Sequence, residues 1–313
     1  MHKIGFIIYP SVSPMTFAAT TVFELANWKV GSSIYEIALV SERGGAVECS
    51  LGCEIQTSSF RRRKFDTLIV AGGVSVPSTM PGLLNYLRAA ADRTERMASI
   101  CTAAFVLAEA GLLDGRRATT HWYHASELQR LYPTVKVDAD RIFTADGPMW
   151  TSAGMSAGID LALALVEKDV GAEVARSVAK LLVVYHRRAG GQSQYSTLLD
   201  LDAQSDRVQT ALTFAKEHLS ERLSVDALAS AAFLSPRQFT RLFKEETGQS
   251  PAKAVERLRI ESARLMMEAG RFSADEIARK NGFGNRERMR RSFVRTIGQS
   301  PPVIQRSVSA LHP

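Results

Sequence analysis

Two stretches of the chain, fifty residues apart, place arginines at the helical spacing that contact with DNA requires. Residues 233–251 and residues 283–301 both begin with Phe and end in Gly-Gln-Ser-Pro. In each stretch apolar residues recur at helical spacing, and many of the positions between them are cationic. A guanidinium group pairs with guanine O6 and N7 and also binds phosphate, so this pattern predicts a helix that lies in a major groove. The candidate DNA-contacting residues are Arg237, Gln238, Thr240, Arg241 and Lys244 in the first stretch, and Arg286, Arg288, Arg290, Arg291 and Arg295 in the second.

Each stretch also carries the start and stop signals of a short helix. Ser235 is suited to be the N-cap of the first helix, with Gln238 completing a capping box. Asn285 is the matching N-cap of the second helix. Gly248 and Gly298 are expected to end the two helices, because glycine adopts the left-handed conformation of a C-cap.

The positive charge of the chain is concentrated in its last third. Residues 206–313 hold 19 Lys and Arg against 12 Asp and Glu, whereas residues 1–205 hold 20 of each. The net charge of +7 therefore belongs to the segment with the repeated stretches, which indicates a polyanionic partner for that segment. A basic surface that only aids solubility is the alternative for the charge taken alone.

One cysteine stands where a strand is expected to meet a helix. The apolar run 97–101 predicts a strand, and residues 102–110 follow at once with helical character. A sharp turn at Cys101 would expose the thiol near a helix N-terminus, which lowers a thiol pKa. The neighbouring strand ends in Gly72 and Gly73, whose backbone N–H groups are expected nearby. This arrangement is typical of a nucleophile, or of the wall of a binding pocket.

The elements around these residues predict two domains. Strands are expected at residues 3–9, 35–41, 46–57, 65–73, 97–101, 118–121 and 135–150, and helices at 15–28, 81–96, 102–110, 122–131, 155–168 and 172–187. Alternation of strands and helices predicts an α/β sandwich with a mainly parallel sheet. Beyond a linker, residues 207–219, 225–232, 236–247, 251–269, 274–281, 285–297 and a segment after Pro302 all predict helices.

The C-terminal residues resemble the AraC/XylS DNA-binding domain over about residues 207–307. The matching residues are Leu228-Ala229, Ser235, Phe239, Arg241, Phe243-Lys244, Gly248–Pro251, Ile277-Ala278, Gly282-Phe283, Phe293, Gly298 and Ser300-Pro301. The resemblance implies two helix-turn-helix units whose recognition helices enter successive major grooves. It makes Arg237, Thr240 and Arg241 base-facing in the first helix, and Arg286, Arg290 and Arg291 in the second. Arg288 and Arg295 are expected to meet phosphate, and phosphate contact stays an alternative for each arginine.

The N-terminal residues resemble the PfpI and class I glutamine amidotransferase-like fold, and more narrowly the GlxA branch of AraC-type regulators. Three motifs carry the narrower resemblance, namely 111–122, 150–160 and 188–194. The chain is thus similar to a flavodoxin-like parallel-sheet sandwich followed by an all-α double helix-turn-helix domain. We expect a sensor domain at 1–187, a linker at 188–206 and a DNA-binding domain at 207–313.

The resemblance argues against catalysis by Cys101. Hydrolytic relatives place a histidine directly after the cysteine, where this chain has Thr102, and an acid early in the first helix. Residues 14–19 contain no Asp or Glu, and Glu24 lies further along that helix. His121 is the remaining candidate base, and we interpret it as a buried, hydrogen-bonded structural residue. We therefore expect no enzyme activity, and a former catalytic site that serves as a pocket.

A pocket at the carboxyl ends of the parallel strands would hold a small-molecule effector. The candidate lining residues are Tyr9, Gly73, Cys101, Thr102, His121 and Trp122. Trp122 or Trp150 would suit a cationic effector, although we interpret both tryptophans as core residues. No cofactor or metal is expected. Cys49 and Cys53 have a C-x3-C spacing without the His or Cys pair that zinc needs.

Composition and length bound the remaining possibilities. No window approaches 18 uncharged apolar residues, and the apolar run near the N-terminus is too short for a signal-peptide core, so the cytoplasm is expected. We predict a DNA-binding transcriptional regulator that forms a homodimer through its N-terminal domain and has RNA polymerase as a further partner. Helices 155–168 or 172–187 would form the dimer, or else pack on their own sheet. The alternative function is a cysteine-dependent hydrolase or deglycase fused to a DNA-binding domain.

Overall fold

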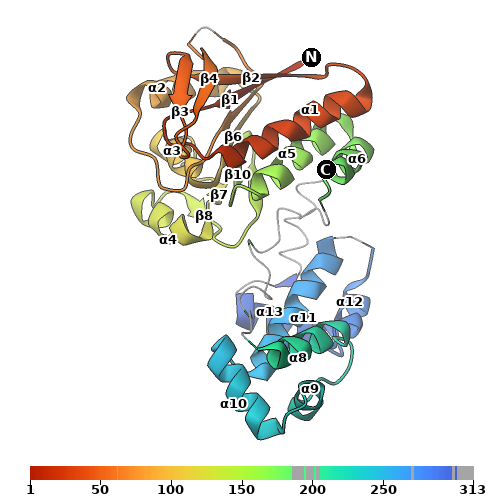
Figure 1. Cartoon of the computed structure of the whole chain (residues 1–313). Coiled ribbons are helices and arrows are strands. Elements are labelled where there is room, and N and C mark those ends of the chain that lie inside the picture. The colour runs from red at the N-terminus through yellow and green to blue at the C-terminus, as the bar shows by residue number, and fades with distance from the viewer. Residues whose placement is uncertain are drawn as a thin grey trace. The chain divides into compact units, whose positions relative to one another are not determined.

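A computed structural model describes residues 1–61, 63–184, 194, 201, 205–268, 271–297 and 300–301. The chain divides into two compact units, Met1–Gln194 and Tyr195–Pro313 (Figure 1). Most of the expected linker, and the helix expected after Pro302, lie outside the described residues. The bounds 1–187, 188–206 and 207–313 therefore stay predictions. Within the described part, no helix combines the length and the apolar character that crossing a bilayer would require.

The first unit is built on one large sheet. Within the described residues its strands are β1 (His2–Ile7), β2 (Tyr35–Ser41), β3 (Gly45–Glu48), β4 (Glu54–Ser59), β5 (Thr67–Val70), β6 (Arg96–Ile100), β9 (Phe143–Asp146) and β10 (Met149–Ser152), in the order β3-β4-β2-β1-β5-β6-β10-β9. The strands from β4 to β10 in this order pair in parallel, and the two outermost pairs are antiparallel. This is the predicted parallel-sheet sandwich. Its strand order reverses between β1 and β5, the place where such sheets bind ligands.

Helices cover both faces of this sheet (Figure 1). Helices α1 (Ala18–Val30), α5 (Ala157–Val170) and α6 (Ala172–Leu181) lie together on one face, and α2 (Pro81–Ala90) and α3 (Ala104–Glu109) lie on the other. Because both faces are covered, the central strands are buried along their length, as in β5 and β6, where every residue is buried. Helix α4 (Trp122–Leu131) lies beside the short strands β7 (Arg117–Ala118) and β8 (Lys136–Val137).

Two expectations for this unit are corrected by non-local contacts. The helix expected to reach Arg96 ends at Ala90, because Arg96 opens strand β6. The strand expected at 118–121 stops at Ala118, because Thr119 and Thr120 form side-chain hydrogen bonds instead. Helix α5 is buried along most of its length against α1, α6 and β10. It therefore packs on its own sheet, which is one of the two alternatives that the sequence left open for residues 155–168.

The second unit contains the two predicted helix-turn-helix units. Its helices are α8 (Asp206–Glu217), α9 (Val225–Ala231), α10 (Pro236–Thr247), α11 (Pro251–Glu268), α12 (Ala274–Lys280) and α13 (Arg286–Ile297). Phe239 and Phe243 of α10 are buried in one apolar cluster, and Met289 and Phe293 of α13 are buried in a second one. Helix α11 contributes residues to both clusters and so joins the two copies.

Replacing Gly282 by alanine is expected to destabilise the second unit by about 2–5 kcal/mol. Gly282 has a φ of +68°, and a Cβ there would lie 2.1 Å from the backbone oxygen of Leu219. Gly248 has a φ of +70° with nothing within 4 Å of such a Cβ, so Gly248→Ala is a matched control that is expected to lose only about 1–2 kcal/mol. Urea unfolding followed by circular dichroism measures both variants. Equal losses would show that the close approach to Leu219 is unimportant.

Candidate nucleic-acid interface

Helix α10 exposes the cationic residues that the sequence singled out. Its N-cap Ser235 accepts a hydrogen bond from the Gln238 backbone in a capping box, and Gly248 ends the helix in the left-handed conformation. With Phe239 and Phe243 buried, the other face is exposed and consists of Arg237, Gln238, Thr240, Arg241 and Lys244. The side-chain oxygen of Gln238 accepts hydrogen bonds from the hydroxyl and the backbone N–H of Ser235. The side-chain NH2 group of Gln238 is therefore the part that remains for contact with DNA.

Helix α13 repeats this arrangement with more charge. The side-chain oxygen of Asn285 accepts the Arg288 backbone N–H at 2.9 Å, which is the predicted N-cap bond. Met289 and Phe293 are buried, and the opposite face carries exposed guanidinium groups. These groups belong to Arg286, Arg288, Arg290, Arg291 and Arg295. The expected stop at Gly298 lies outside the described residues.

An acidic residue that the sequence analysis overlooked lies among these arginines. Both oxygens of Glu287 accept hydrogen bonds of 2.9 Å from Arg290, and Arg291 lies 3.7 Å from the same carboxylate. The hydrogen bonds from Arg290 are the main cause of the lowered pKa of Glu287. The spacing of three and four residues along a helix was the available signal for these contacts.

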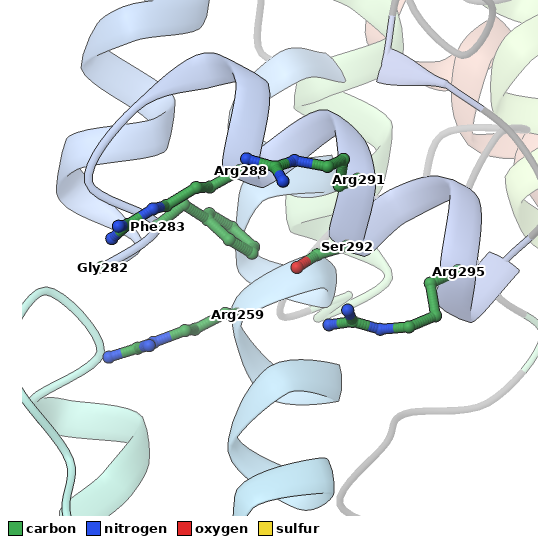
Figure 2. Close-up of a pocket in the computed structure, with 7 residues that line it drawn as sticks. All are labelled: Arg259, Gly282, Phe283, Arg288, Arg291, Ser292 and Arg295. Atoms are coloured by element: carbon green, nitrogen blue, oxygen red, sulfur yellow. The ribbon is translucent and has the colours of Figure 1, made fainter.

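Arg288, Arg291 and Arg295 surround a surface hollow of about 380 Å³ (Figure 2). Arg259 of α11 is a fourth arginine that lines this hollow, and its role is structural. It donates hydrogen bonds to the backbone oxygens of Leu219 and Glu221, and burial lowers its pKa. The guanidinium group of Arg295 contacts Glu256. The hollow therefore has a cationic rim of exposed side chains that an anionic group can approach.

Glu287→Gln is expected to increase the affinity for DNA by about two- to fivefold. The substitution removes a negative charge from the cationic face and releases Arg290 and Arg291 for contact with phosphate. Glu217→Gln, an exposed carboxylate on α8, is the matched control. Fluorescence anisotropy with labelled duplex DNA measures both affinities. A loss of affinity in Glu287→Gln would instead mean that the carboxylate itself contacts DNA, for example through cytosine N4.

The first unit contains the predicted strand–Cys101–helix elbow. Cys101 has a φ of 57°, a conformation that is strained for a residue with a side chain. The neighbouring loop approaches closely, because a Cβ on Gly72 would lie 2.2 Å from the Ile100 oxygen. The Thr102 hydroxyl donates to the Gly73 oxygen at 3.0 Å and accepts from the Gly73 N–H at 3.1 Å. This N–H group is therefore already paired.

The thiol of Cys101 differs from the expectation of a lowered pKa. Burial raises the pKa of Cys101 to about 11, which outweighs a hydrogen bond from the Thr102 backbone that lowers it. The side chain is almost fully buried, with its sulfur 3.8 Å from the Gly73 oxygen. At neutral pH this residue is a protonated thiol, which is a poor nucleophile. Glu24 of α1, the acid that the sequence offered further along this helix, is exposed.

Tyr9 lies beside this elbow at the end of β1. Tyr9 is 6% exposed, and its hydroxyl makes no hydrogen bond of good geometry with the residues that the structure describes. Burial is the main cause of its raised pKa, the nearby Cys101 adds to it, and an interaction with the Thr102 side chain lowers it. Tyr9, Gly73, Cys101 and Thr102 are thus four predicted lining residues that come together at the strand ends.

The two remaining lining candidates lie at the start of α4. His121 is the N-cap of this helix and accepts the Tyr123 N–H through Nδ1 at 3.3 Å, so it has the expected structural role but is only half-buried. Trp122 is 51% exposed, so its assignment to the core was wrong. Trp150 is buried as expected. The hydroxyl of Thr120, which precedes His121, donates to the Cys101 backbone oxygen at 2.9 Å and links this segment to the elbow.

Gln194, the last residue of the first unit, is held to this same segment. Its side-chain oxygen accepts the Trp122 N–H at 2.8 Å. Its amide nitrogen donates to the backbone oxygens of Thr120 and Ala139 at 2.8 and 2.9 Å. Gln194 is the last residue of the 188–194 motif, and the sequence alone indicated no function for it.

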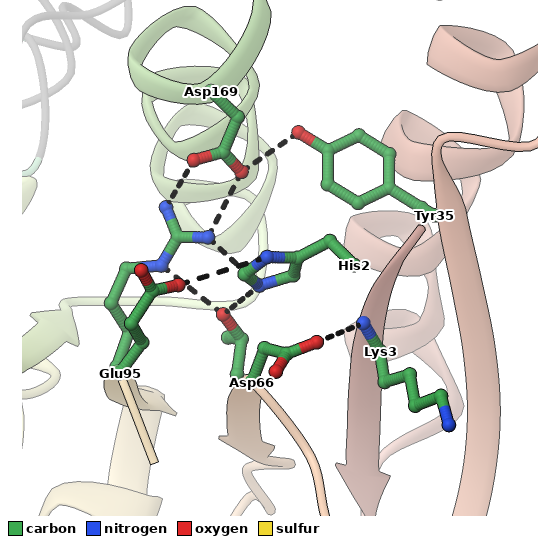
Figure 3. A network of polar contacts seen from close by, with 8 residues as sticks. His2, Lys3, Tyr35, Asp66, Glu95 and Asp169 are labelled. Carbon is green, nitrogen blue, oxygen red and sulfur yellow. Dashed lines mark hydrogen bonds and ion pairs between the residues drawn. The ribbon is translucent and has the colours of Figure 1, made fainter.

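A polar network at the amino ends of the strands holds the first unit together (Figure 3). The side chain of Arg96 is 7% exposed and donates to both oxygens of Asp169 at 2.6 and 2.9 Å. The Tyr35 hydroxyl donates to Asp169 at 2.9 Å, and His2 lies 2.9 Å from Arg96. These residues begin β1, β2 and β6, so the network joins three strands to the end of α5. It lies at the opposite strand ends from Cys101, and its role is structural.

Comparison with known families gives one match within each of the two units. Residues 16–168 match the DJ-1/PfpI family, and residues 228–307 match a helix-turn-helix domain. The first match covers the sheet except β1, together with the Cys101 elbow, and the second covers α10 to α13.

Relatives over nearly the full length are regulators. The chain is 30% identical to the HTH-type transcriptional regulator CdhR of Pseudomonas aeruginosa, over 95% of this chain and 89% of that protein. It is 28% identical to the HTH-type transcriptional regulator GlxA of Rhizobium meliloti, over 98% of this chain and 96% of that protein. A shorter match of 33% identity, over 56% of this chain and 75% of the other, is to an isonitrile hydratase of Pseudomonas putida. The resemblance to the GlxA branch is thereby confirmed, and the fold also occurs in an enzyme.

Proposed function

The chain belongs to the HTH-type transcriptional regulators that join a DJ-1/PfpI domain to an AraC-type helix-turn-helix domain, and we propose that it controls transcription through α10 and α13 in response to a small molecule. The observation that carries this proposal is the repeated exposed cationic face, backed in each copy by buried apolar residues. A face of this kind gives a helix both a fixed position on the protein and a surface for the major groove.

The two helices are proposed to divide the work of binding. Helix α10 presents Thr240 and the Gln238 amide beside Arg237 and Arg241, a mixed set that suits direct readout of bases. Helix α13 presents five arginines and suits phosphate contact as well as readout. Its charge would then contribute most of the dependence of the affinity on salt concentration.

The effector is proposed to bind beside Tyr9, Gly73, Cys101 and Thr102. The buried, unpartnered Tyr9 hydroxyl supports this location, because an unsatisfied buried polar group is unfavourable until a partner arrives. A small nitrogenous or amino-acid-like metabolite is the proposed class of effector, because the Tyr9 hydroxyl can exchange a hydrogen bond with it. Exposed Trp122 at the start of α4 would contact a cationic part of it.

Gln194 is proposed to transmit the effector signal toward the DNA-binding unit. A ligand that displaces the Cys101 backbone would disturb its hydrogen bond to Thr120, and Thr120 in turn binds the Gln194 amide. The chain leaves the first unit immediately after Gln194. A homodimer formed through the first unit would let this change alter how two DNA-binding units are presented. Contact with RNA polymerase at a promoter and a cytoplasmic location complete the proposal.

Absence of catalysis is part of the proposal, and the hydratase relative supplies the alternative. The raised pKa of Cys101 and the paired Gly73 N–H favour the regulator. We expect alkylation of Cys101 by iodoacetamide to be slow at neutral pH and to rise about tenfold per pH unit up to its pKa of about 11. Fast alkylation near pH 7, or thiol-dependent turnover that disappears in Cys101→Ala, would favour the enzyme instead.

A thermal-shift screen of small metabolites on the full chain tests the effector site, because a ligand that binds the native state raises the melting temperature. A hit is expected to lose its effect in Tyr9→Phe, which removes only the unpartnered hydroxyl. It is expected to persist in Tyr123→Phe, which removes a hydroxyl from an exposed aromatic residue on α4. A hit that Tyr9→Phe leaves unchanged would contradict the proposed location.

A further inference from the structure

Cys49 and Cys53 lie opposite each other at the tip of the β3–β4 hairpin. The strands pair through Glu48 and Glu54, and the Cys49 N–H donates to the Cys53 oxygen at 2.9 Å. The connecting loop is Ser50-Leu51-Gly52, with Gly52 at a φ of 77°, a common way to close a three-residue hairpin. Directly opposed side chains on one face of a hairpin have adjacent Cβ atoms.

The two sulfur atoms are 2.8 Å apart. Cys49 is buried whereas Cys53 is exposed, and both are free thiols in the structure. A hydrogen bond from Cys53 is the main cause of the lowered pKa of Cys49, and the same bond is the main cause of the raised pKa of Cys53. An accessible sulfur and a protected sulfur thus lie within direct reach of each other.

The hairpin tip is hydrogen-bonded to the loop that follows β1. The Ser50 N–H donates to the Val12 oxygen at 3.0 Å, and the Ser11 N–H donates to the Glu48 oxygen at 3.0 Å. Val12 pairs with Gly73 in an isolated bridge. A covalent change at the cysteines therefore acts on the backbone that flanks Tyr9 and Gly73.

We propose that Cys49 and Cys53 form a reversible disulfide with a small-molecule disulfide such as oxidised glutathione as the oxidant. Cys53 is exposed, so its sulfur is the one that the oxidant can reach. Cys53 gives up its proton to the Cys49 thiolate, which passes it on to water, and the Cys53 sulfur attacks one sulfur of the oxidant, forms a mixed disulfide and releases one glutathione thiolate. The Cys49 thiolate then attacks the Cys53 sulfur, the Cys49–Cys53 bond forms, and the second glutathione thiolate leaves. Two cysteine thiols are oxidised and lose their protons, and one glutathione disulfide is reduced to two thiols.

Oxidation of the full chain with glutathione disulfide, followed by N-ethylmaleimide and peptide mass spectrometry, tests this proposal. In the wild type we expect the maleimide labels of Cys49 and Cys53 to disappear together and one peptide to contain their disulfide. In Cys49→Ser the reaction should stop at a stable glutathione adduct on Cys53. The amount of this adduct should be at least about tenfold smaller in the wild type than in Cys49→Ser, because the neighbouring Cys49 thiol displaces the glutathione.

Cys53→Ser, a change at an exposed position, should abolish the disulfide while Cys49 keeps its maleimide label. A wild-type protein that retains a glutathione adduct on Cys53 with Cys49 still free would overturn the proposal. So would a disulfide that joins Cys53 to Cys101 or to a second chain, or labelling of both cysteines that oxidation does not change.

Discussion

Arg241→Ala and Arg291→Ala will each weaken binding to the specific operator by about 1–3 kcal/mol, or roughly 5- to 150-fold. Each change removes a fork of donors from the exposed face of one helix and leaves the buried side untouched. Because both side chains are more than half exposed, the fold should be unaffected. Anisotropy titrations with operator and with unrelated duplex DNA measure the specific and the non-specific affinity.

Substitutions that keep the charge separate base readout from phosphate contact. Arg241→Lys and Arg291→Lys retain the cation but lose the planar fork that pairs bidentately with guanine. A base-reading arginine should lose most of its specificity in the lysine variant, whereas a phosphate-binding arginine should lose little. Lys216→Ala, on the exposed surface of α8, is the control for net charge and should leave the ratio of the two affinities unchanged.

Asp169→Ala will destabilise the first unit by about 3–5 kcal/mol. The substitution leaves the Arg96 guanidinium buried at 7% exposure without its carboxylate, and it also removes the partner of the Tyr35 hydroxyl. All three tryptophans, at positions 28, 122 and 150, belong to this unit, so tryptophan fluorescence during urea unfolding reports on it alone.

A second carboxylate in the same network supplies the control for Asp169. Glu95 lies 3.7 Å from His2, but its side chain is 71% exposed. Glu95→Ala should therefore change the stability by less than about 1 kcal/mol. Similar losses of stability in the two variants would mean that burial does not determine how much the Arg96–Asp169 pair stabilises the first unit.

The sequence was most informative where structure depends on neighbouring residues. The capping box of Ser235 and the cap at Asn285 predicted both recognition helices to within a residue, since caps act within one helical turn. The apolar alternation likewise predicted the class of the first domain. The same local reasoning did not detect Glu287, although its spacing from Arg290 and Arg291 was visible.

Predictions that depended on distant contacts were less successful. The pKa of Cys101 was expected to fall beside a helix N-terminus, but burial raises it. Trp122 was assigned to the core from its residue type, yet about half of it is exposed. The helix before Arg96 was extended too far, because the partner that draws Arg96 into the sheet is Asp169, 73 residues away. Burial and long-range pairing are set by the assembled fold.

Hydroxyl-radical footprinting of the wild type, Arg241→Ala and Arg291→Ala on one operator tests the central claim most directly. Each DNA-binding unit of the wild type should protect two segments on one face of the DNA, about one helical turn apart. Arg241→Ala should lose protection of one segment and Arg291→Ala that of the other. Loss of the same segment in both variants, or unchanged protection in both, would contradict the assignment of α10 and α13 as a pair of recognition helices.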